Sequence, residues 1–219
     1  MSIADRRTYL ADLIEEMKTP WPDNRTVNVV CHGHSVPAGY FGHAFVDTFS
    51  AYPHLLHRGL KERFPHAVIN VIVTAIGGEE SDRGAERFER DVLCHQPRVI
   101  TIDYGLNDRR IGLEKAEASW RGMIEAALRQ DVKLILLTPT HDNTRAGDPE
   151  QWRLLELQAE QTRELAAEYE VGLADSMDAF DRYIESGGDL SDLLSWVNHP
   201  NRTGHELVAS ELLRWFPIG

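Results

Sequence analysis

The sequence predicts an α/β protein, a flavodoxin-like three-layer α/β/α sandwich with a parallel five-stranded sheet. Short β-branched runs alternate with longer amphipathic segments along the chain. Most of the short runs are unbroken apolar stretches, which is typical of strands covered on both faces in a parallel sheet. The alternation also implies right-handed crossovers, which place helices on both faces of the sheet.

Five short segments are expected to be the strands, because each is rich in β-branched or aliphatic residues and lies between longer polar stretches. They are residues 27–31, 67–73, 99–103, 133–138 and 172–175. The segments between them are expected to be helices.

Three helices have clear signals. Residues 113–130 repeat apolar side chains at helical spacing. Asp148 is a candidate N-cap, followed by Pro149 and by Gln151, for a helix that runs to about residue 169. That helix would bury Leu155, Ala159, Leu165 and Tyr169. Residues 203–206 have the pattern of a capping box for a last helix, whose apolar stripe is Val208, Leu212 and Trp215.

Length and composition fit one globular domain. The 219 residues are within the range of a single α/β domain, and 42% hydrophobic with 26% charged residues is ordinary for a soluble protein. Because the chain has no repeat, low-complexity tract or Pro/Gly-rich linker, we expect one domain over residues 1–219.

Charge and cysteine content limit the partners. A net charge of −12 argues against nucleic acid and anionic membrane surfaces as partners. No apolar run is long enough to span a bilayer, and the first residues lack the apolar core of a signal peptide. Cys31 and Cys94 are expected to be buried, reduced thiols. The sequence therefore predicts a cytoplasmic protein, and the oligomeric state stays open.

Four residues in separate loops have the chemistry of an acyl-transfer site. Ser35, Gly78 and Asn107 each follow one of the first three strands, so the topology brings them to one edge of the sheet. His199 precedes the last helix, and its approach to the others is a further expectation. A serine needs a base, and a tetrahedral intermediate needs donors aimed at its oxyanion.

The blocks around these residues resemble the SGNH (GDSL-type) hydrolase family over about residues 29–208. Gly-His-Ser at 33–35 stands for the usual Gly-Asp-Ser, and Gly-Leu-Asn-Asp at 105–108 is the intact third block. Gly78 matches the second block, and the His-Pro pair at 199–200 matches the last. The resemblance implies Ser35 as nucleophile and His199 as general base, with no cofactor. It also implies an oxyanion hole made by the N–H groups of Ser35 and Gly78 and the amide of Asn107.

The chain departs from the family pattern at two positions. His34 replaces the aspartate before the nucleophile, and Trp196 stands where the family places the acid that orients the histidine. A backbone carbonyl near Trp196 is the preferred acceptor for the Nδ1 proton of His199, with Asp192 as the alternative. Without a carboxylate at this place, turnover is expected to be modest.

The substrate is expected to be a small ester. The segment after Ser35 is mixed aromatic and polar, and no long apolar lid for a fatty chain is visible. This favours a small acyl group, such as acetyl, on a polar alcohol such as a carbohydrate. His141 and Asp142 follow the fourth strand and are candidate substrate contacts.

Three alternatives remain open at this point. A thioesterase or lysophospholipase of the same family is possible, because its pocket would lie in loops of unknown shape. A binding module that has lost turnover would explain the absent acid. A metal-dependent hydrolase could use the side chains of His32, His34, His43 and Asp47, although their spacing does not match known zinc motifs and no metal is expected.

Overall fold

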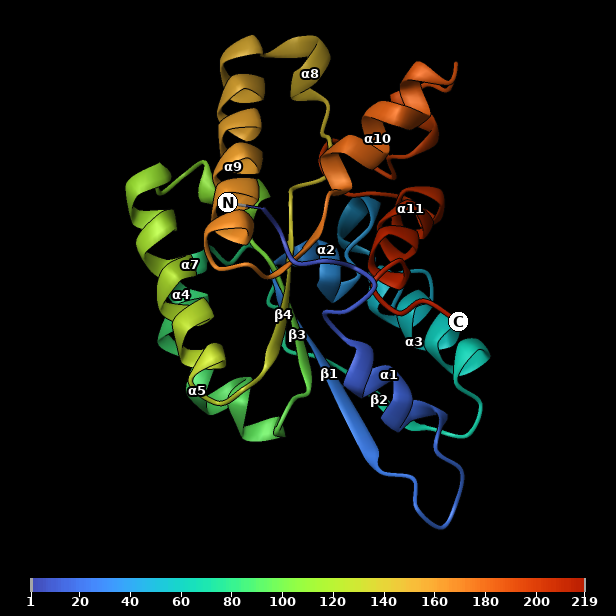
Figure 1. Cartoon of the computed structure of the whole chain (residues 1–219). Helices are drawn as coiled ribbons and strands as arrows, with labels where there is room; N and C mark the ends of the chain where they lie inside the picture. The colour runs from blue at the N-terminus through green and yellow to red at the C-terminus, as the bar shows by residue number, and fades with distance from the viewer. Residues whose placement is uncertain (1, 219) are drawn as a thin grey trace.

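The computed structural model describes residues 2–218, except for the side chain of Ala44, and has the predicted three layers (Figure 1). All strand pairs in the five-stranded sheet are parallel, in the order β2-β1-β3-β4-β5. The strands are β1 (Thr26–Gly33), β2 (Val68–Val73), β3 (Val99–Asp103), β4 (Lys133–Leu137) and β5 (Gly172–Ala174).

Helices cover both faces of the sheet (Figure 1). On one face lie α1 (Ala11–Lys18), α3 (Tyr52–Arg63), α10 (Ser176–Glu185) and α11 (Arg202–Leu213). On the other lie α4 (Ser81–Glu86), α5 (Phe88–Asp91) and α7 (Leu113–Leu128), and α9 (Pro149–Glu168) contributes to the core on both faces. The remaining short helices are α2 (Ser35–Ala38), α6 (Gly105–Asp108), α8 (Thr144–Gly147) and the 3₁₀ turns Gly42–Ala44, Leu93–His95 and Leu190–Asp192.

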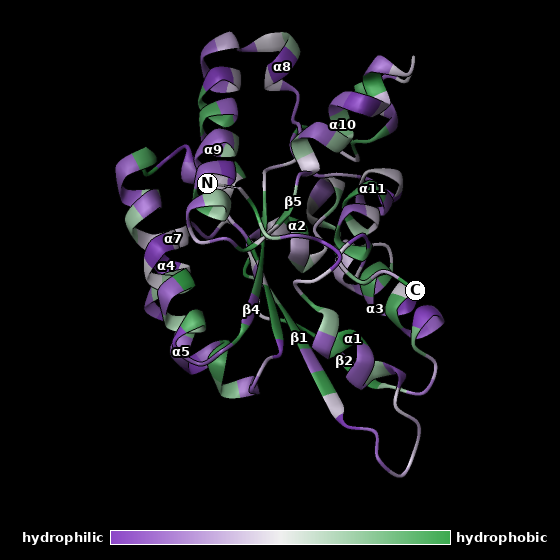
Figure 2. Cartoon of the chain, in the orientation of Figure 1, coloured by the Kyte–Doolittle hydropathy of each residue, from purple (hydrophilic) through white to green (hydrophobic). Residues whose placement is uncertain are grey.

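The sheet has a hydrophobic core on each face, because strand side chains alternate between the two faces. Successive strand side chains point to opposite faces, so Val99 packs into the core on the α3 and α11 side while Ile100 packs against α7. Hydrophobic residues gather along the strands, whereas the helices carry both hydrophobic and hydrophilic residues (Figure 2). No helix within residues 2–218 has the length and apolar character needed to cross a membrane.

The helix signals are partly confirmed. The Asp148 side chain accepts a hydrogen bond from the Gln151 N–H at 3.1 Å and caps α9, as expected. The capping box at 203–206 is wrong. The Asn201 side chain caps α11 instead, accepting from the Gly204 N–H at 3.1 Å, and asparagine is among the best N-cap residues.

Three burial expectations also need correction. β2 lies at the sheet edge, so Val68 and Val73 are exposed rather than covered on both faces. Tyr169 is only partly buried, since it follows the end of α9 and its ring stacks beneath the guanidinium of Arg121. Cys31 is buried as expected, but Cys94 is exposed; both are free thiols.

Candidate active site

Ser35 lies where β1 turns into α2. Gly33 ends the strand beside β3, and a Cβ there would collide with the backbone carbonyl of Asp103. The His34 N–H donates to that same carbonyl at 3.2 Å, so the turn is fixed against β3. As the first residue of α2, Ser35 has a backbone N–H without an acceptor inside the helix.

His199 approaches Ser35 from the loop before α11. Its Nε2 lies 2.9 Å from the Ser35 Oγ, within hydrogen-bond distance. Ser195 fixes this loop, because its N–H and its Oγ both donate to the His199 carbonyl, at 2.9 and 3.0 Å. Burial, the largest cause, lowers the pKa of His199, and a positive charge on the nearby His34 would lower it further, so the imidazole is neutral at pH 7 and can accept a proton.

The orientation of His199 differs from both sequence predictions. Within residues 2–218, its buried Nδ1 has no hydrogen-bond partner, so the predicted carbonyl near Trp196 is wrong. Asp192 is not the acceptor either, because its carboxylate accepts from the Asp189 N–H at 3.1 Å and the Tyr183 hydroxyl at 3.3 Å. Trp196 is instead an exposed side chain that stacks on His43, with ring centroids 4.7 Å apart.

Gly78 and Asn107 lie in adjoining loops. Gly78 has φ +78°, a conformation that favours glycine. One N–H of the Asn107 amide donates to the Glu79 carbonyl at 2.9 Å, which leaves its second N–H available. Arg110 donates to the Gly78 carbonyl at 2.7 Å, and no group in the described chain accepts the Gly78 N–H. Both residues therefore present donors of the kind an oxyanion requires.

Asp108 anchors the short helix that carries Asn107. Its carboxylate accepts from the Ser81 N–H and from the Trp120 Nε1–H, each at 2.8 Å. These two bonds tie α6 to α4 and to α7. Burial raises the pKa of Asp108 to about 6, although both hydrogen bonds act in the opposite direction.

A buried polar network supports the Gly78 loop, and sequence reasoning missed it. Arg87 binds the Glu79 carboxylate through two nitrogens, at 2.9 and 2.5 Å, and the Tyr104 hydroxyl donates to the same carboxylate at 2.7 Å. His32 lies 3.1 Å from that hydroxyl and 3.0 Å from the Thr74 hydroxyl, so both its nitrogens are engaged. His32 is thus a packing residue rather than a candidate metal ligand, and residues 2–218 contain no cluster of three or more potential ligands.

The two predicted substrate contacts are buried side chains. His141 is 0% exposed, and its ring packs against Trp152 at 4.8 Å. Asp142 is 2% exposed, and its carboxylate accepts from Arg109 at 2.6 Å and from the Thr144 N–H at 3.1 Å. The prediction that they touch substrate is wrong, because neither side chain is exposed.

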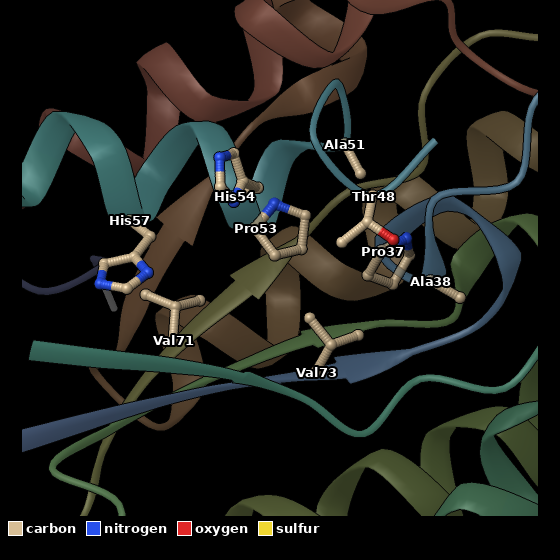
Figure 3. Close-up of a pocket in the computed structure, with 9 residues that line it drawn as sticks. All are labelled: Pro37, Ala38, Thr48, Ala51, Pro53, His54, His57, Val71 and Val73. Atoms are coloured by element: carbon tan, nitrogen blue, oxygen red, sulfur yellow. The ribbon is translucent and has the colours of Figure 1, made fainter. Parts of the chain in front are cut away.

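Two cavities adjoin these elements. One, about 150 Å³, lies between α2, α3 and β2 and is lined mainly by apolar groups with two histidines, His54 and His57 (Figure 3). The other is an open groove of about 580 Å³ beside Gly78. Its lining is charged: Glu79, Glu80, Arg83, Glu86, Arg87 and Arg90.

A serine and a neutral histidine in hydrogen-bond contact, with amide donors nearby, are the elements of a serine hydrolase. The chain belongs to the GDSL-like lipase/acylhydrolase family, whose model matches residues 31–207. It is therefore an ester-hydrolysing serine hydrolase, as the sequence resemblance implied.

The chain is also similar to several known proteins, and the solved structures among them share its fold. An acetylxylan esterase of Geobacillus stearothermophilus is 24% identical over 168 residues, which cover 71% of this chain and 75% of that protein. The crystal structure of Axe2, an acetylxylan esterase of the same organism, superposes with a TM-score of 0.77 at 20% identity, covering 88% of this chain and 95% of that one. LAE5, an alpha/beta hydrolase from the metagenome of Lake Arreo, gives 0.74 at 23% identity, with 91% and 97% covered.

Proposed function

We propose that this protein is a carbohydrate acetylesterase that works through an acyl-enzyme on Ser35. The observation that carries the proposal is the 2.9 Å contact between the Ser35 Oγ and the His199 Nε2, reached across 164 positions of sequence. The activity of similar proteins, which are esterases of acetylated xylan and xylooligosaccharides, supports acetyl as the acyl group.

In the proposed mechanism, these residues act in successive steps. His199 takes the Ser35 hydroxyl proton as the Oγ attacks the ester carbonyl. The N–H groups of Ser35 and Gly78 and the free N–H of Asn107 stabilise the oxyanion. Their hydrogen bonds act mainly in the transition state. His199 then protonates the departing alcohol, and a water activated by the same imidazole hydrolyses the acetyl-serine.

The surroundings of the site favour a polyol as the alcohol. The charged groups of Arg83, Glu86 and Arg90 are exposed in the groove beside Gly78; such groups can hydrogen-bond sugar hydroxyls and do not suit an alkyl chain. The apolar cavity next to α2 holds only about 150 Å³, below the roughly 300–1,000 Å³ typical of ligand pockets. A fatty acyl ester is thus the less favoured substrate.

An exposed aromatic surface borders the catalytic loop on another side. Trp196 is 47% exposed and stacks on His43, and Phe45, two positions after His43, is 63% exposed. Exposed apolar patches on monomeric proteins commonly mark binding sites. This surface supports a bulky alcohol that extends beyond the acetyl group.

Ser35→Ala tests the nucleophile. The variant should lose turnover of p-nitrophenyl acetate and labelling by a serine-directed phosphonate, while it keeps its fold. Ser119→Ala is the matched control, since the Ser119 hydroxyl donates to the Lys115 carbonyl on an outer helix. Full activity in Ser35→Ala would overturn the assignment, and an adduct on another residue would relocate it.

Acetate release tests the substrate class. The protein should release acetate from acetylated xylooligosaccharides and should be much less active on a long-chain acyl-CoA or a lysophospholipid. Preference for either of the latter would replace the carbohydrate proposal with a thioesterase or a lysophospholipase. A cytoplasmic location remains our proposal from the sequence, tested by fractionating cells that express the protein.

A further inference from the structure

A second histidine and a carboxylate lie directly behind the nucleophile. The His34 Nδ1 is 3.5 Å from the Ser35 Oγ, on the opposite side of the imidazole from Asp103, whose Oδ1 is 3.4 Å from the His34 Nε2. All three side chains are buried, with exposures of 7%, 1% and 4% for Ser35, His34 and Asp103. We propose that Asp103 and His34 are positioning residues that supply, from behind Ser35, the negative charge that is missing at Trp196. This inference rests on the proposed function.

The hydrogen bonds fix the tautomer of His34. Its Nδ1 accepts a hydrogen bond from the Val36 N–H at 3.2 Å, so this nitrogen carries a lone pair and no proton. The proton of the neutral ring is then on Nε2 and faces the Asp103 carboxylate. At 3.4 Å the Asp103 contact is long, so its effect is electrostatic more than that of a short hydrogen bond.

Asp103 is well placed to act as a buried charge. Within residues 2–218, His34 is the only side chain able to carry a positive charge that lies within 4.0 Å of its carboxylate. A buried carboxylate without an arginine or lysine partner is costly, and such groups gather at functional sites. Asp103 also affects the buried Tyr52 hydroxyl, since burial and then the Asp103 charge raise its pKa well above the usual value.

The pair acts on His199 through space and through Ser35. The Ser35 hydroxyl has two acceptors, the His199 Nε2 at 2.9 Å and the His34 Nδ1 at 3.5 Å, and the shorter contact receives the proton. When His199 becomes cationic, the lone pair of His34 and the charge of Asp103 stabilise it. No proton moves to His34, because a cationic His34 would lose the Val36 bond and repel His199.

Other titratable groups face the two histidines and also contribute to the pH dependence of the site. Around His34 they are Tyr104, with ring centroids 6.5 Å apart, and Asp108. Around His199 they are Tyr40, with centroids 6.3 Å apart, and His205, whose pKa burial and then His199 lower. None of these groups is a carboxylate in contact with His199.

Asp103→Asn removes the charge and keeps the shape. We expect kcat for p-nitrophenyl acetate to fall about tenfold to a hundredfold, less than the roughly 10⁴ lost when a triad acid in contact with the base is neutralised. KM should change little, and the acid limb of the kcat/KM profile should move to lower pH, because His199 loses a stabilising anion. Glu211→Gln is the matched control: this carboxylate is also buried, and pairs with Arg182 and Arg214 on the outer side of α11.

His34→Asn separates the electrostatic role of His34 from its role in capping α2. The asparagine oxygen can accept from the Val36 N–H and so cap α2, but it cannot connect Ser35 to Asp103. We expect a loss of kcat similar to that of Asp103→Asn. The double variant should lose no more than about twofold beyond either single variant, because residues that act as one unit are not additive.

The outcomes separate this inference from the proposed function. Phosphonate labelling of Ser35 and wild-type kcat in both variants would overturn the inference and leave the esterase intact. Unchanged acid limbs with additive losses would show that the residues only support the fold, which also overturns it. If Asp103→Asn does not fold, His34→Asn alone decides by its kcat and pH profile. Activity retained in Ser35→Ala would overturn the proposed function itself.

Discussion

Lowering the pH from about 7.5 to about 5.5 should destabilise the native state by about 3 kcal/mol, because three buried histidines fold in their neutral form. Burial, as the largest cause, lowers the pKa of His32 and His205 to about 3 and that of His141 to about 4. All three are 0% exposed. The His205 Nδ1 accepts from the Tyr52 N–H at 3.2 Å, so protonation there would break a backbone contact at the start of α3.

The sign and size follow from linkage. In the unfolded chain each histidine takes up a proton near pH 6.5, whereas in the native state it does so only near pH 3 to 4. The contribution of these histidines to the free energy of unfolding is therefore complete above about pH 6.5. It falls by about 1.4 kcal/mol per histidine for each pH unit below that value. The three together lose about 4 kcal/mol by about pH 5.5.

Asp108 opposes this loss. Its pKa is raised to about 6 by burial, so its native carboxyl binds a proton before the unfolded one does. Its contribution is present at low pH and is lost as the pH rises through about 6, which offsets about 1 kcal/mol at about pH 5.5. The net expectation of about 3 kcal/mol is a large part of the roughly 5–15 kcal/mol typical of a domain.

Urea unfolding at about pH 7.5, 6.5 and 5.5 measures this directly. His205→Asn should be less stable at the highest pH, because it loses the ring contact with Phe41, at 5.3 Å between centroids. Its free energy of unfolding should nevertheless fall less with acid, by about 2 rather than about 3 kcal/mol over this range. His66→Asn changes an exposed side chain and should leave the slope as it is. A stability that is flat across this range, or an unaltered slope in His205→Asn, would refute the reasoning.

Three further outcomes follow from the site. Asn107→Ala should lower kcat about 10²- to 10³-fold with little change in KM, measured on p-nitrophenyl acetate, and a rise in KM alone would make Asn107 a binding residue. Asp192→Asn should keep near-normal turnover at every pH tested, since its carboxylate binds Asp189 and Tyr183; a loss near 10⁴ would restore it as the orienting acid. Activity on p-nitrophenyl esters should fall from acetyl towards decanoyl, whereas a rise of about 0.8 kcal/mol per methylene would reveal a long apolar pocket.

Local patterns were sufficient for most of the fold. The strands around Val99 and Leu134 are buried aliphatic runs, and the helix after Asp148 carries its own cap, so neither depends on distant residues. The start of α11 was misplaced because Thr203 and Asn201 are both good caps, and only the backbone conformation selects one. The exposure of β2 could not be foreseen, since strand order is not a local property.

The sequence alone predicted the contact between Ser35 and His199, which the structure confirms, and it predicted that Ser35, Gly78 and Asn107 share one edge of the sheet. Loops after parallel strands gather there by topology, so Ser35, Gly78 and Asn107 needed no tertiary information. Tertiary structure decided everything that depends on direction and burial. It turned Asp192 into a capping residue, buried His141 behind Trp152, and brought Asp103 to the back of His34, because side-chain contacts across separate strands and loops leave no periodic signal in the chain.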